Sequence, residues 1–451
     1  MTQNVDIREF LDENKISPLQ KFIIFICLMI VIVDGIDISI MGFVAPVIKN
    51  EWDIPITALA PVMSAALVGL GLGAVISGPL ADKYGRKKLL IINLLGFGFF
   101  TLFAALSSNV TELMIYRFIA GLFMGGVMPQ AVTLTTDYSP MRVNSRMVTL
   151  ILSGFTLGAA IGGFLAAWVI PNYGWHAMMI IGGILPLILA VVVALKLPES
   201  IGFKVLKQHP RSEIESIIHK IAPDFDTTGK VFVLPKPKTK SVDNPIKTIL
   251  SPFYLAGTLL LWWIYASGLF VVYLLGSWLP MMSNEFGFSI SEASMITAIY
   301  QLGGPVGCYI CGYLMDKFNP YKGLILFASM AIIFMMFVGE VGHDFYLYSA
   351  MCFCIGICMN GTNSGLNGLS SGFYPVFARA TGNSWMHGIA RIGAVASAFA
   401  GAHFLNQGWS SNKIFTILCF PILGMVIAII LMKMIYSPKR MQERSLDKAE
   451  I

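Results

Sequence analysis

Two aspartates stand inside a long apolar run near the start of the chain, in the stretch VIVDGIDISIMG that covers residues 31 to 42. Asp34 and Asp37 are three residues apart, so a helix through this run would place both carboxyl groups on one face. A charge near the centre of a bilayer costs roughly 2.5 to 3.5 kcal/mol and usually serves a function. The pair is therefore the first candidate for chemistry in this sequence.

A basic residue is predicted at the same depth. If the first helix starts near Lys21, a rise of about 1.5 Å per residue puts Asp34 roughly 20 Å and Asp37 roughly 24 Å along it. Arg117 follows Glu112 in a helix that enters from the opposite side, which puts it roughly 22 Å up in a core about 30 Å thick. Two acids and one base leave a charge imbalance that a proton can settle, so we interpret them as a proton-coupling set. The alternative is a fixed ion pair that only holds two helices together.

The composition shows what surrounds these charges. Of the 451 residues, 56% are hydrophobic and only 12% are charged, about half the charged share of a typical soluble domain. Such a chain is a membrane protein. The net charge of +6 requires no nucleic-acid partner, because the cations fall in loops where they contact water and anionic lipid headgroups. The first 21 residues are polar and no cleavage pattern follows the first apolar run, so a cleaved signal peptide is not expected.

Apolar runs of about 20 residues predict twelve membrane-spanning helices in two groups of six. The first group covers residues 22–43, 58–80, 89–107, 112–136, 147–170 and 175–196. The second covers residues 254–282, 291–315, 321–338, 345–368, 380–404 and 412–436. The predicted divisions are an N-terminal segment (1–21), an N-terminal half (22–196), a linker (197–250), a C-terminal half (251–436) and a tail (437–451). The linker is expected to be solvated, with a short helix near residues 212–220.

Basic residues alternate between the loops and so orient the chain, because Lys and Arg near span ends favour the cytoplasmic side. Lys21, Lys83, Arg142 and Lys322 belong to the basic side, whereas the opposite loops are almost bare of cations. Both termini and the linker are therefore predicted to be cytoplasmic.

The two groups of six are related by an internal repeat. The run Gly78-Pro-Leu-Ala-Asp82-Lys83 after the second span corresponds to Gly312-Tyr-Leu-Met-Asp316-Lys317 after the eighth, at an offset of 234 residues. The same offset relates three further pairs: Gly42 with Gly276, Pro46 with Pro280, and Gly154 with Gly388. Because the motif falls on the same side of the membrane in both halves, the repeats are predicted to be parallel.

The first copy of this loop continues as Tyr84-Gly85-Arg86-Lys87-Lys88, and the whole pattern resembles the signature of the major facilitator superfamily. The resemblance implies an all-α membrane protein of twelve transmembrane helices in two six-helix halves. A turn with an acid and several cations can lock to a neighbouring helix end in one conformer and release it in another. The alternative is that these charges only set topology. The predicted gating residues are Gly78, Asp82, Gly85, Arg86 and Lys87 in the first copy, and Asp316 and Lys317 in the second.

Within that superfamily, Asp34-Gly-Ile-Asp37 followed by Gly42-Phe-Val-Ala-Pro46 is similar to the aromatic acid/proton symporter family. Motifs at residues 171–176, 197–200, 315–320 and 379–386 resemble its branch that carries 4-hydroxybenzoate and protocatechuate. The resemblance implies that the paired acids of the first span, Arg117 and Arg391 are transport residues. No metal cluster, nucleotide-binding loop or nucleophile motif appears in the sequence, so no enzyme, cofactor or metal site is predicted.

Candidate substrate-binding residues lie in the tenth and eleventh spans. Arg391 is roughly 18 Å from the cytoplasmic end of its helix, close to the midplane where such transporters bind substrate, and a guanidinium there could hold a carboxylate bidentately. His387 shares its face and stands where the family usually has an aliphatic residue. It could add a donor for a ring hydroxyl or a second carboxylate, or it could only pack. Asn360 and Asn363 could line the cavity or bond neighbouring helices.

These expectations combine into proton-coupled uptake of an aromatic carboxylate by alternating access. The expected partners are protons, the substrate and the lipid bilayer, with the chain acting as a monomer in the inner membrane of a bacterium. A proton-coupled exporter is one alternative, because residues 158–163 resemble the antiporter pattern G-P-x-x-G-G without its proline. A receptor that binds the acid without moving it is another, but it would need a signalling domain.

Overall fold

The computed structural model describes residues 3–234, 244–341, 344–375 and 378–436. The predicted tail at 437–451 and the proline-lysine run at 235–238 lie outside the described residues. The chain divides into two compact units, which we call the N-terminal unit (Met1–Val44 with Ala65–Lys240) and the C-terminal unit (Ala45–Ser64 with Ser241–Ile451).

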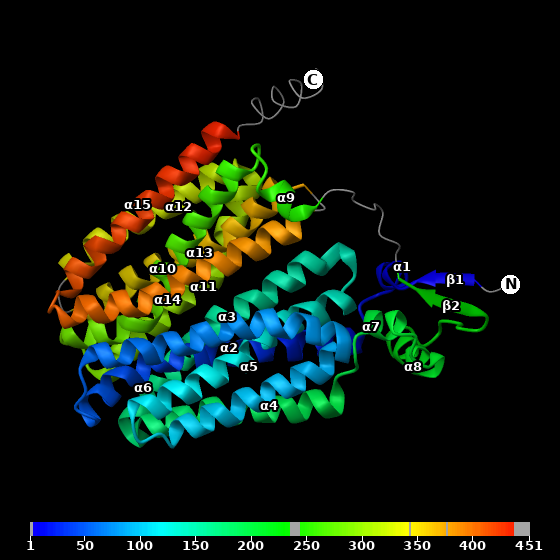
Figure 1. Ribbon diagram of the computed structural model, residues 1–451, viewed down its shortest axis with the longest axis horizontal. Coiled ribbons are helices and arrows are strands. Elements are labelled where there is room, and N and C mark those ends of the chain that lie inside the picture. The colour runs from blue at the N-terminus through cyan, green and yellow to red at the C-terminus, as the bar shows by residue number, and fades with distance from the viewer. Residues whose placement is uncertain (1–2, 235–243, 342–343, 376–377, 437–451) are drawn as a thin grey trace. The chain divides into compact units, whose positions relative to one another are not determined.

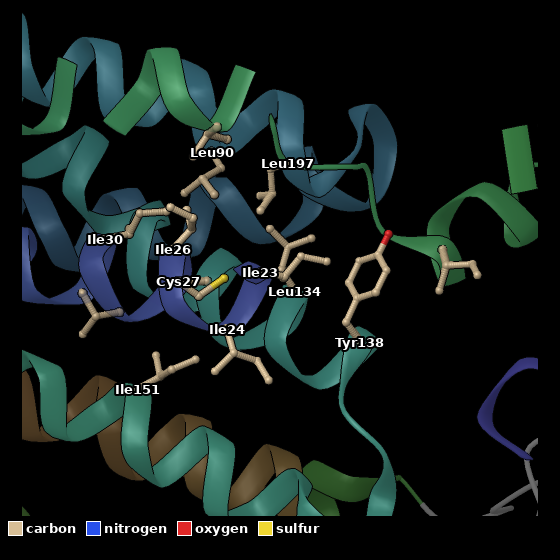
Figure 2. Packing of buried hydrophobic residues seen from close by; sticks show 14 of the residues in the cluster. Ile23, Ile24, Ile26, Cys27, Ile30, Leu90, Leu134, Tyr138, Ile151 and Leu197 are labelled. Carbon is tan, nitrogen blue, oxygen red and sulfur yellow. The ribbon is translucent and has the colours of Figure 1, made fainter. Parts of the chain in front are cut away.

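Long helices build the N-terminal half (Figure 1). They are α2 (Pro18–Glu51), α3 (Leu59–Tyr84, after the 3-10 turn η1 at Ile56–Ala58), α4 (Arg86–Ala105), α5 (Val110–Tyr138) and α6 (Met141–Lys196). Each is long enough to cross a bilayer core about 30 Å thick. Buried side chains of α2, α4, α5 and α6 form one hydrophobic core, in which Figure 2 shows Ile26, Leu90, Leu134 and Ile151.

The C-terminal half repeats this arrangement with its own helices. They are α9 (Pro245–Ile249), α10 (Leu255–Glu285), α11 (Ile290–Lys317), α12 (Pro320–Phe337, continued by the 3-10 turn η2 at Val338–Glu340), α13 (Phe345–Phe373), α14 (Arg379–Asn406) and α15 (Ser411–Ile435). Helix α11 begins with a complete capping box, in which Ser289 and Glu292 satisfy each other's backbone N–H groups.

Two of these helices explain how twelve predicted spans map onto the structure. Among the described residues, ten helices are long and apolar enough to cross a membrane. Helix α6 counts once but has 56 residues, about 84 Å of helix, and is broken at Gly174, whose φ is 77°. It therefore supplies the fifth and sixth spans. Helix α11, with 28 residues, supplies the eighth. The predicted all-α, twelve-helix fold in two halves is confirmed.

Closely packed glycines show the internal repeat in three dimensions. A Cβ atom on Gly73 of α3 would collide with the backbone carbonyl of Leu122 in α5. At the same offset of 234 residues, a Cβ atom on Gly307 of α11 would collide with the backbone carbonyl of Ile357 in α13. Each half therefore brings its second and fourth spans into backbone contact at the same place.

The N-terminal segment and part of the linker fold together into what we call the peripheral subdomain. It comprises β1 (Gln3–Asp6), α1 (Ile7–Glu13), α7 (Ile201–Leu206), α8 (Arg211–Ile221) and β2 (Lys230–Val233), which Figure 1 shows at one end of the N-terminal unit. Strands β1 and β2 pair in parallel, with Gln3 opposite Lys230 and Asp6 opposite Val233.

Helix α8 confirms the short helix predicted near residues 212–220, but the prediction of a solvated linker is wrong here. Its isoleucines recur at helical spacing and join Phe10 and Leu11 of α1 in one buried cluster; they are Ile214, Ile217, Ile218 and Ile221. The apolar face of α8 has to be buried against other apolar side chains, and the N-terminal segment, about 200 residues earlier in the chain, provides them.

We predict that the glycine contacts limit the stability of each half. Gly73→Ala and Gly307→Ala should each lower the free energy of unfolding by about 1–3 kcal/mol, because the added methyl group overpacks a backbone contact. Gly78→Ala and Gly312→Ala are the matched controls, since nothing lies within 4 Å of a Cβ at either position. Thermal melting of the purified variants measures the difference. Equal melting temperatures in the two sets would contradict the prediction.

Candidate functional site

A fully buried ion pair joins α2 to α5 in the N-terminal unit. Nη1 of Arg117 donates to Oδ2 of Asp37 at 2.8 Å and to Oδ1 at 3.0 Å, and Nη2 donates to the backbone oxygen of Asp37 at 3.2 Å. Thr101 of α4 donates its hydroxyl to Oδ1 of Asp37 at 3.1 Å. Both charged side chains are 0% exposed. Three hydrogen bonds to the carboxylate offset much of its desolvation.

Helix α6 also packs against this ion pair, at Gly182. A Cβ at this position would lie 3.5 Å from Oδ1 of Asp37 and closer still to Ile40. Helices α2, α4, α5 and α6 therefore converge on one carboxylate. Asp34, one turn earlier on α2, is 1% exposed. The structure brings the predicted Asp37 and Arg117 into direct contact, with Asp34 three residues away along α2.

We predict that Arg117 and Asp37 are energetically coupled. Arg117→Met alone should lower the free energy of unfolding by about 3–5 kcal/mol, because it leaves an uncompensated carboxylate in the apolar interior. The double variant Asp37→Asn with Arg117→Met should recover part of that loss. Thermal unfolding of the single and double variants measures the coupling, and a purely additive result would argue against a shared interaction.

A polar cluster in the C-terminal unit consists of His387, Asn367 and Tyr265, and we call it the histidine cluster. Nε2 of His387 lies 2.7 Å from Oδ1 of Asn367. Nδ2 of Asn367 donates to the backbone oxygen of Asn363 at 3.1 Å and lies 3.5 Å from the hydroxyl of Tyr265. The rings of Tyr265 and His387 meet edge to face, with centroids 4.8 Å apart. The cluster joins α10, α13 and α14.

The two predicted asparagines of α13 have different surroundings. Asn360 donates its amide to the oxygen of Gly356 at 3.1 Å, which is a bond within its own helix. Asn363 is 8% exposed, and neither its amide oxygen nor its amide nitrogen has a hydrogen-bond partner among the described residues. Its amide lies against Gly268 of α10. Arg391, one turn beyond His387, is partly exposed.

The first copy of the loop motif is anchored by a residue that the site prediction missed. Gly85 adopts a φ of 101° between α3 and α4, a conformation that favours glycine. Oε1 of Glu199 then accepts hydrogen bonds from the backbone N–H groups of Arg86 at 3.0 Å and Lys87 at 3.1 Å. A carboxylate at this position caps the positive end of α4. The side chain of Arg86 also pairs with Asp82 at 3.1 Å.

The second copy of the motif is more exposed to its surroundings than the first. Asp316 and Lys317 are exposed, and Lys317 lies over the rings of Tyr313 and Phe318, each 5.7 Å from the centroid. Asn319, rather than a distant acid, caps the next helix by accepting from the N–H of Tyr321 at 3.0 Å. The two copies share their sequence pattern but differ in the residue that caps the following helix, which is Glu199 for α4 and Asn319 for α12.

We predict that Glu199 stabilises the start of α4. Glu199→Ala should lower the free energy of unfolding by about 1–2 kcal/mol, because two backbone N–H groups lose their acceptor. Lys88→Ala is the control, since Lys88 is an exposed charge in the same turn. Hydrogen exchange of the amides at residues 86–87 should rise in the Glu199 variant alone. Unchanged protection there would show that the cap contributes nothing.

Comparison with known proteins identifies the class of this protein. The sequence matches the model of the Major Facilitator Superfamily over residues 27–398 and again over residues 261–449. The chain therefore belongs to this superfamily of membrane transporters.

Solved structures show the same fold. A bacterial homologue of the human lysosomal transporter Spinster, in an inward-facing and unoccupied conformation, superposes with a TM-score of 0.69 at 16% identity, covering 93% of this chain and 99% of that one. The D-xylose-proton symporter also gives a TM-score of 0.69, at 15% identity, covering 91% of this chain and 96% of the symporter.

Individual relatives are much closer in sequence. The chain is 42% identical to the 4-hydroxybenzoate transporter PcaK of Pseudomonas aeruginosa, over 93% of this chain and 94% of the relative. It is 40% identical to the transporter of the same name from Acinetobacter baylyi, over 94% of each chain. The gallate transporter of Pseudomonas putida is 37% identical, again over 94% of each chain. These matches confirm the resemblance that the motifs indicated.

Proposed function

We propose that this protein takes up an aromatic carboxylate such as 4-hydroxybenzoate or protocatechuate together with protons, by alternating access. The observation that carries the proposal is 42% identity to a 4-hydroxybenzoate transporter along nearly the whole of both chains. The gallate transporter of Pseudomonas putida is 37% identical over 94% of each chain. 4-Hydroxybenzoate and gallate are both hydroxylated aromatic acids, and the partly exposed Arg391 could bind their carboxylate.

Charge arithmetic favours coupling to protons. A carboxylate that enters a cell against about 100 mV, inside negative, is opposed by roughly 2.3 kcal/mol. One proton carried with it cancels this cost, and the proton gradient can then drive accumulation. The N-terminal unit holds two buried acids, Asp34 and Asp37, with one buried base, Arg117. With both acids ionised, the formal charge of this set is negative, so it can take up a proton.

The roles divide between the two halves. In the proposed cycle the Asp34/Asp37 pair gains a proton in the outward-facing state while Arg391 holds the substrate carboxylate bidentately. Asn363 contributes in the occupied state, because a buried amide without a partner costs about 1–3 kcal/mol and a ligand would remove that cost. Asn360, bonded within its own helix, has the weaker claim to a substrate contact.

We further propose that the chain works as a monomer in the bacterial inner membrane, with both termini cytoplasmic. The alternation of basic loops supports this orientation. In it, the peripheral subdomain and the gating loop of residues 78–87 share the cytoplasmic side. The Glu199 cap would hold the gating loop in one conformer, and its release would accompany opening.

The test is uptake of labelled 4-hydroxybenzoate into proteoliposomes with an imposed inward proton gradient. The wild-type protein should accumulate the acid, and an uncoupler should abolish accumulation. Asp34→Asn should lose uphill uptake completely but retain exchange of labelled for unlabelled acid, because exchange needs no net proton movement. Unchanged uphill uptake by this variant would overturn the coupling role of Asp34. Exit of the acid driven by the same gradient would support the exporter instead.

A further inference from the structure

His387 is held in a fixed orientation although its side chain is exposed. The hydrogen bond to Asn367 fixes one edge of the imidazole, and the ring of Tyr265 packs against it edge to face at 4.8 Å. These contacts come from α13 and α10, whereas His387 belongs to α14. A histidine with only a packing role would not require a hydrogen bond to α13 together with a ring contact to α10.

The orientation of Asn367 determines which ring nitrogen carries the proton. Its Nδ2 donates to the backbone oxygen of Asn363 at 3.1 Å, so the atom that faces His387 is the carbonyl oxygen Oδ1. A carbonyl oxygen can only accept, and Nε2 of His387 must therefore bear a hydrogen. In the neutral imidazole the other nitrogen, Nδ1, is then an acceptor. Because Asn367 takes the donor of this ring, His387 would face a substrate with an acceptor rather than with the donor considered from the sequence.

Nδ1 remains available to a ligand. Within the described residues, the contact through Nε2 is the only hydrogen bond of this ring. Arg391 follows four residues later, and side chains at this spacing have Cβ atoms about 5–6 Å apart on one helical face. Arginine offers donors only, whereas Nδ1 offers an acceptor only. A ligand that binds both side chains needs an anionic group for Arg391 and a hydrogen-bond donor for Nδ1 of His387. An aromatic acid with a hydroxyl group on its ring has these two groups on opposite sides of the ring.

We propose that His387 is a specificity-determining residue that accepts a hydrogen bond from a ring hydroxyl of the transported acid. The site then prefers hydroxylated aromatic acids to unsubstituted ones, and Asn367 acts as a positioning residue that fixes the tautomer of His387. This inference rests on the proposed function, since Arg391 must hold the carboxylate for the hydroxyl to reach Nδ1. One neutral hydrogen bond corresponds to a preference of up to about tenfold.

Three acids distinguish this arrangement from the alternatives: benzoate, 4-hydroxybenzoate and 4-methoxybenzoate. The hydroxyl can donate to Nδ1, whereas the methoxy oxygen can only accept. Titration calorimetry of the purified full-length protein should give 4-hydroxybenzoate a dissociation constant up to about tenfold lower than those of the other two acids. If the hydroxy and methoxy acids bind equally and both bind more tightly than benzoate, Nδ1 donates rather than accepts, and the proposal is overturned.

Two variants and a control complete the experiment. His387→Leu should bring the affinity for 4-hydroxybenzoate down to that for benzoate while leaving the affinity for benzoate nearly unchanged. Asn367→Leu should reduce the preference as well, because the ring is no longer held in one tautomer. Ile392→Ala, at an exposed apolar position beside Arg391, should keep the wild-type ratio. An unchanged ratio in His387→Leu would overturn the role of His387 even if all three acids are still transported.

Failure of the proposed function gives a different pattern. In that case the wild-type protein would bind none of the three acids and would accumulate none of them in proteoliposomes. Binding of all three with the same affinity, together with proton-driven uptake, would instead keep the proposed function and reject only the selective role of His387.

Discussion

The buried pair of Asp37 and Arg117 is the interaction that most constrains the N-terminal half. Taking two charges out of water costs several kcal/mol each, and attraction repays this only when the geometry is close and other hydrogen bonds are made. Here the carboxylate accepts from both the guanidinium and Thr101, and Gly182 leaves room beside it. Four helices must keep their positions for these distances to hold. The glycine contacts between α3 and α5 serve the same end, because they fix the depth at which α5 presents its arginine.

The internal repeat provides a symmetric scaffold on which the chemistry is asymmetric. Gly73 and Gly307 make matching contacts, but the acids do not recur: an offset of 234 residues carries Asp34 onto Gly268 and Asp37 onto Val271. The C-terminal half instead holds the amides of Asn363 and Asn367 and the ring of His387, with Arg391 one turn further along α14. A duplicated fold therefore separates a strongly charged cluster from a neutral hydrogen-bonding one. Such separation supports the proposal that protons and the organic anion bind to different groups.

Much of this arrangement could be predicted from the sequence, because it depends on one-dimensional regularities. Apolar runs predict the spans, and a constant rise per residue predicts that Asp37 and Arg117 share a depth. The helix rotations that bring His387 onto Asn367 could not be predicted in this way, since they follow from side-chain packing between α13 and α14. The spacing of Asn363 and Asn367 was a signal for a polar face, but it did not say which histidine the face would meet.

The cap on α4 could not be predicted from the sequence either, because it depends on a contact between residues far apart in the chain. Glu199 lies more than 100 residues after the loop that it caps, and its own position depends on Tyr138, whose hydroxyl donates to the backbone oxygen of Glu199 at 2.6 Å (Figure 2 shows this tyrosine beside the α2 core). Ser200, the next residue, donates to Asp137 at 2.5 Å.

The peripheral subdomain extends the same network to the N-terminal segment. Arg8 of α1 donates to the backbone oxygen of Thr136 at 2.7 Å, and Arg142 donates to that of Asn14 at 2.9 Å. The ends of α4, α5 and α6 are thus linked to one another and to α1 through short polar contacts. The turn between α3 and α4 is held to this network by the two bonds from Glu199 and by Lys87, whose Nζ donates to the backbone oxygen of Ala194 at 2.8 Å. In the proposed cycle we therefore expect the Glu199 cap to break when this turn moves, while the polar contacts that join α1, α5 and α6 persist.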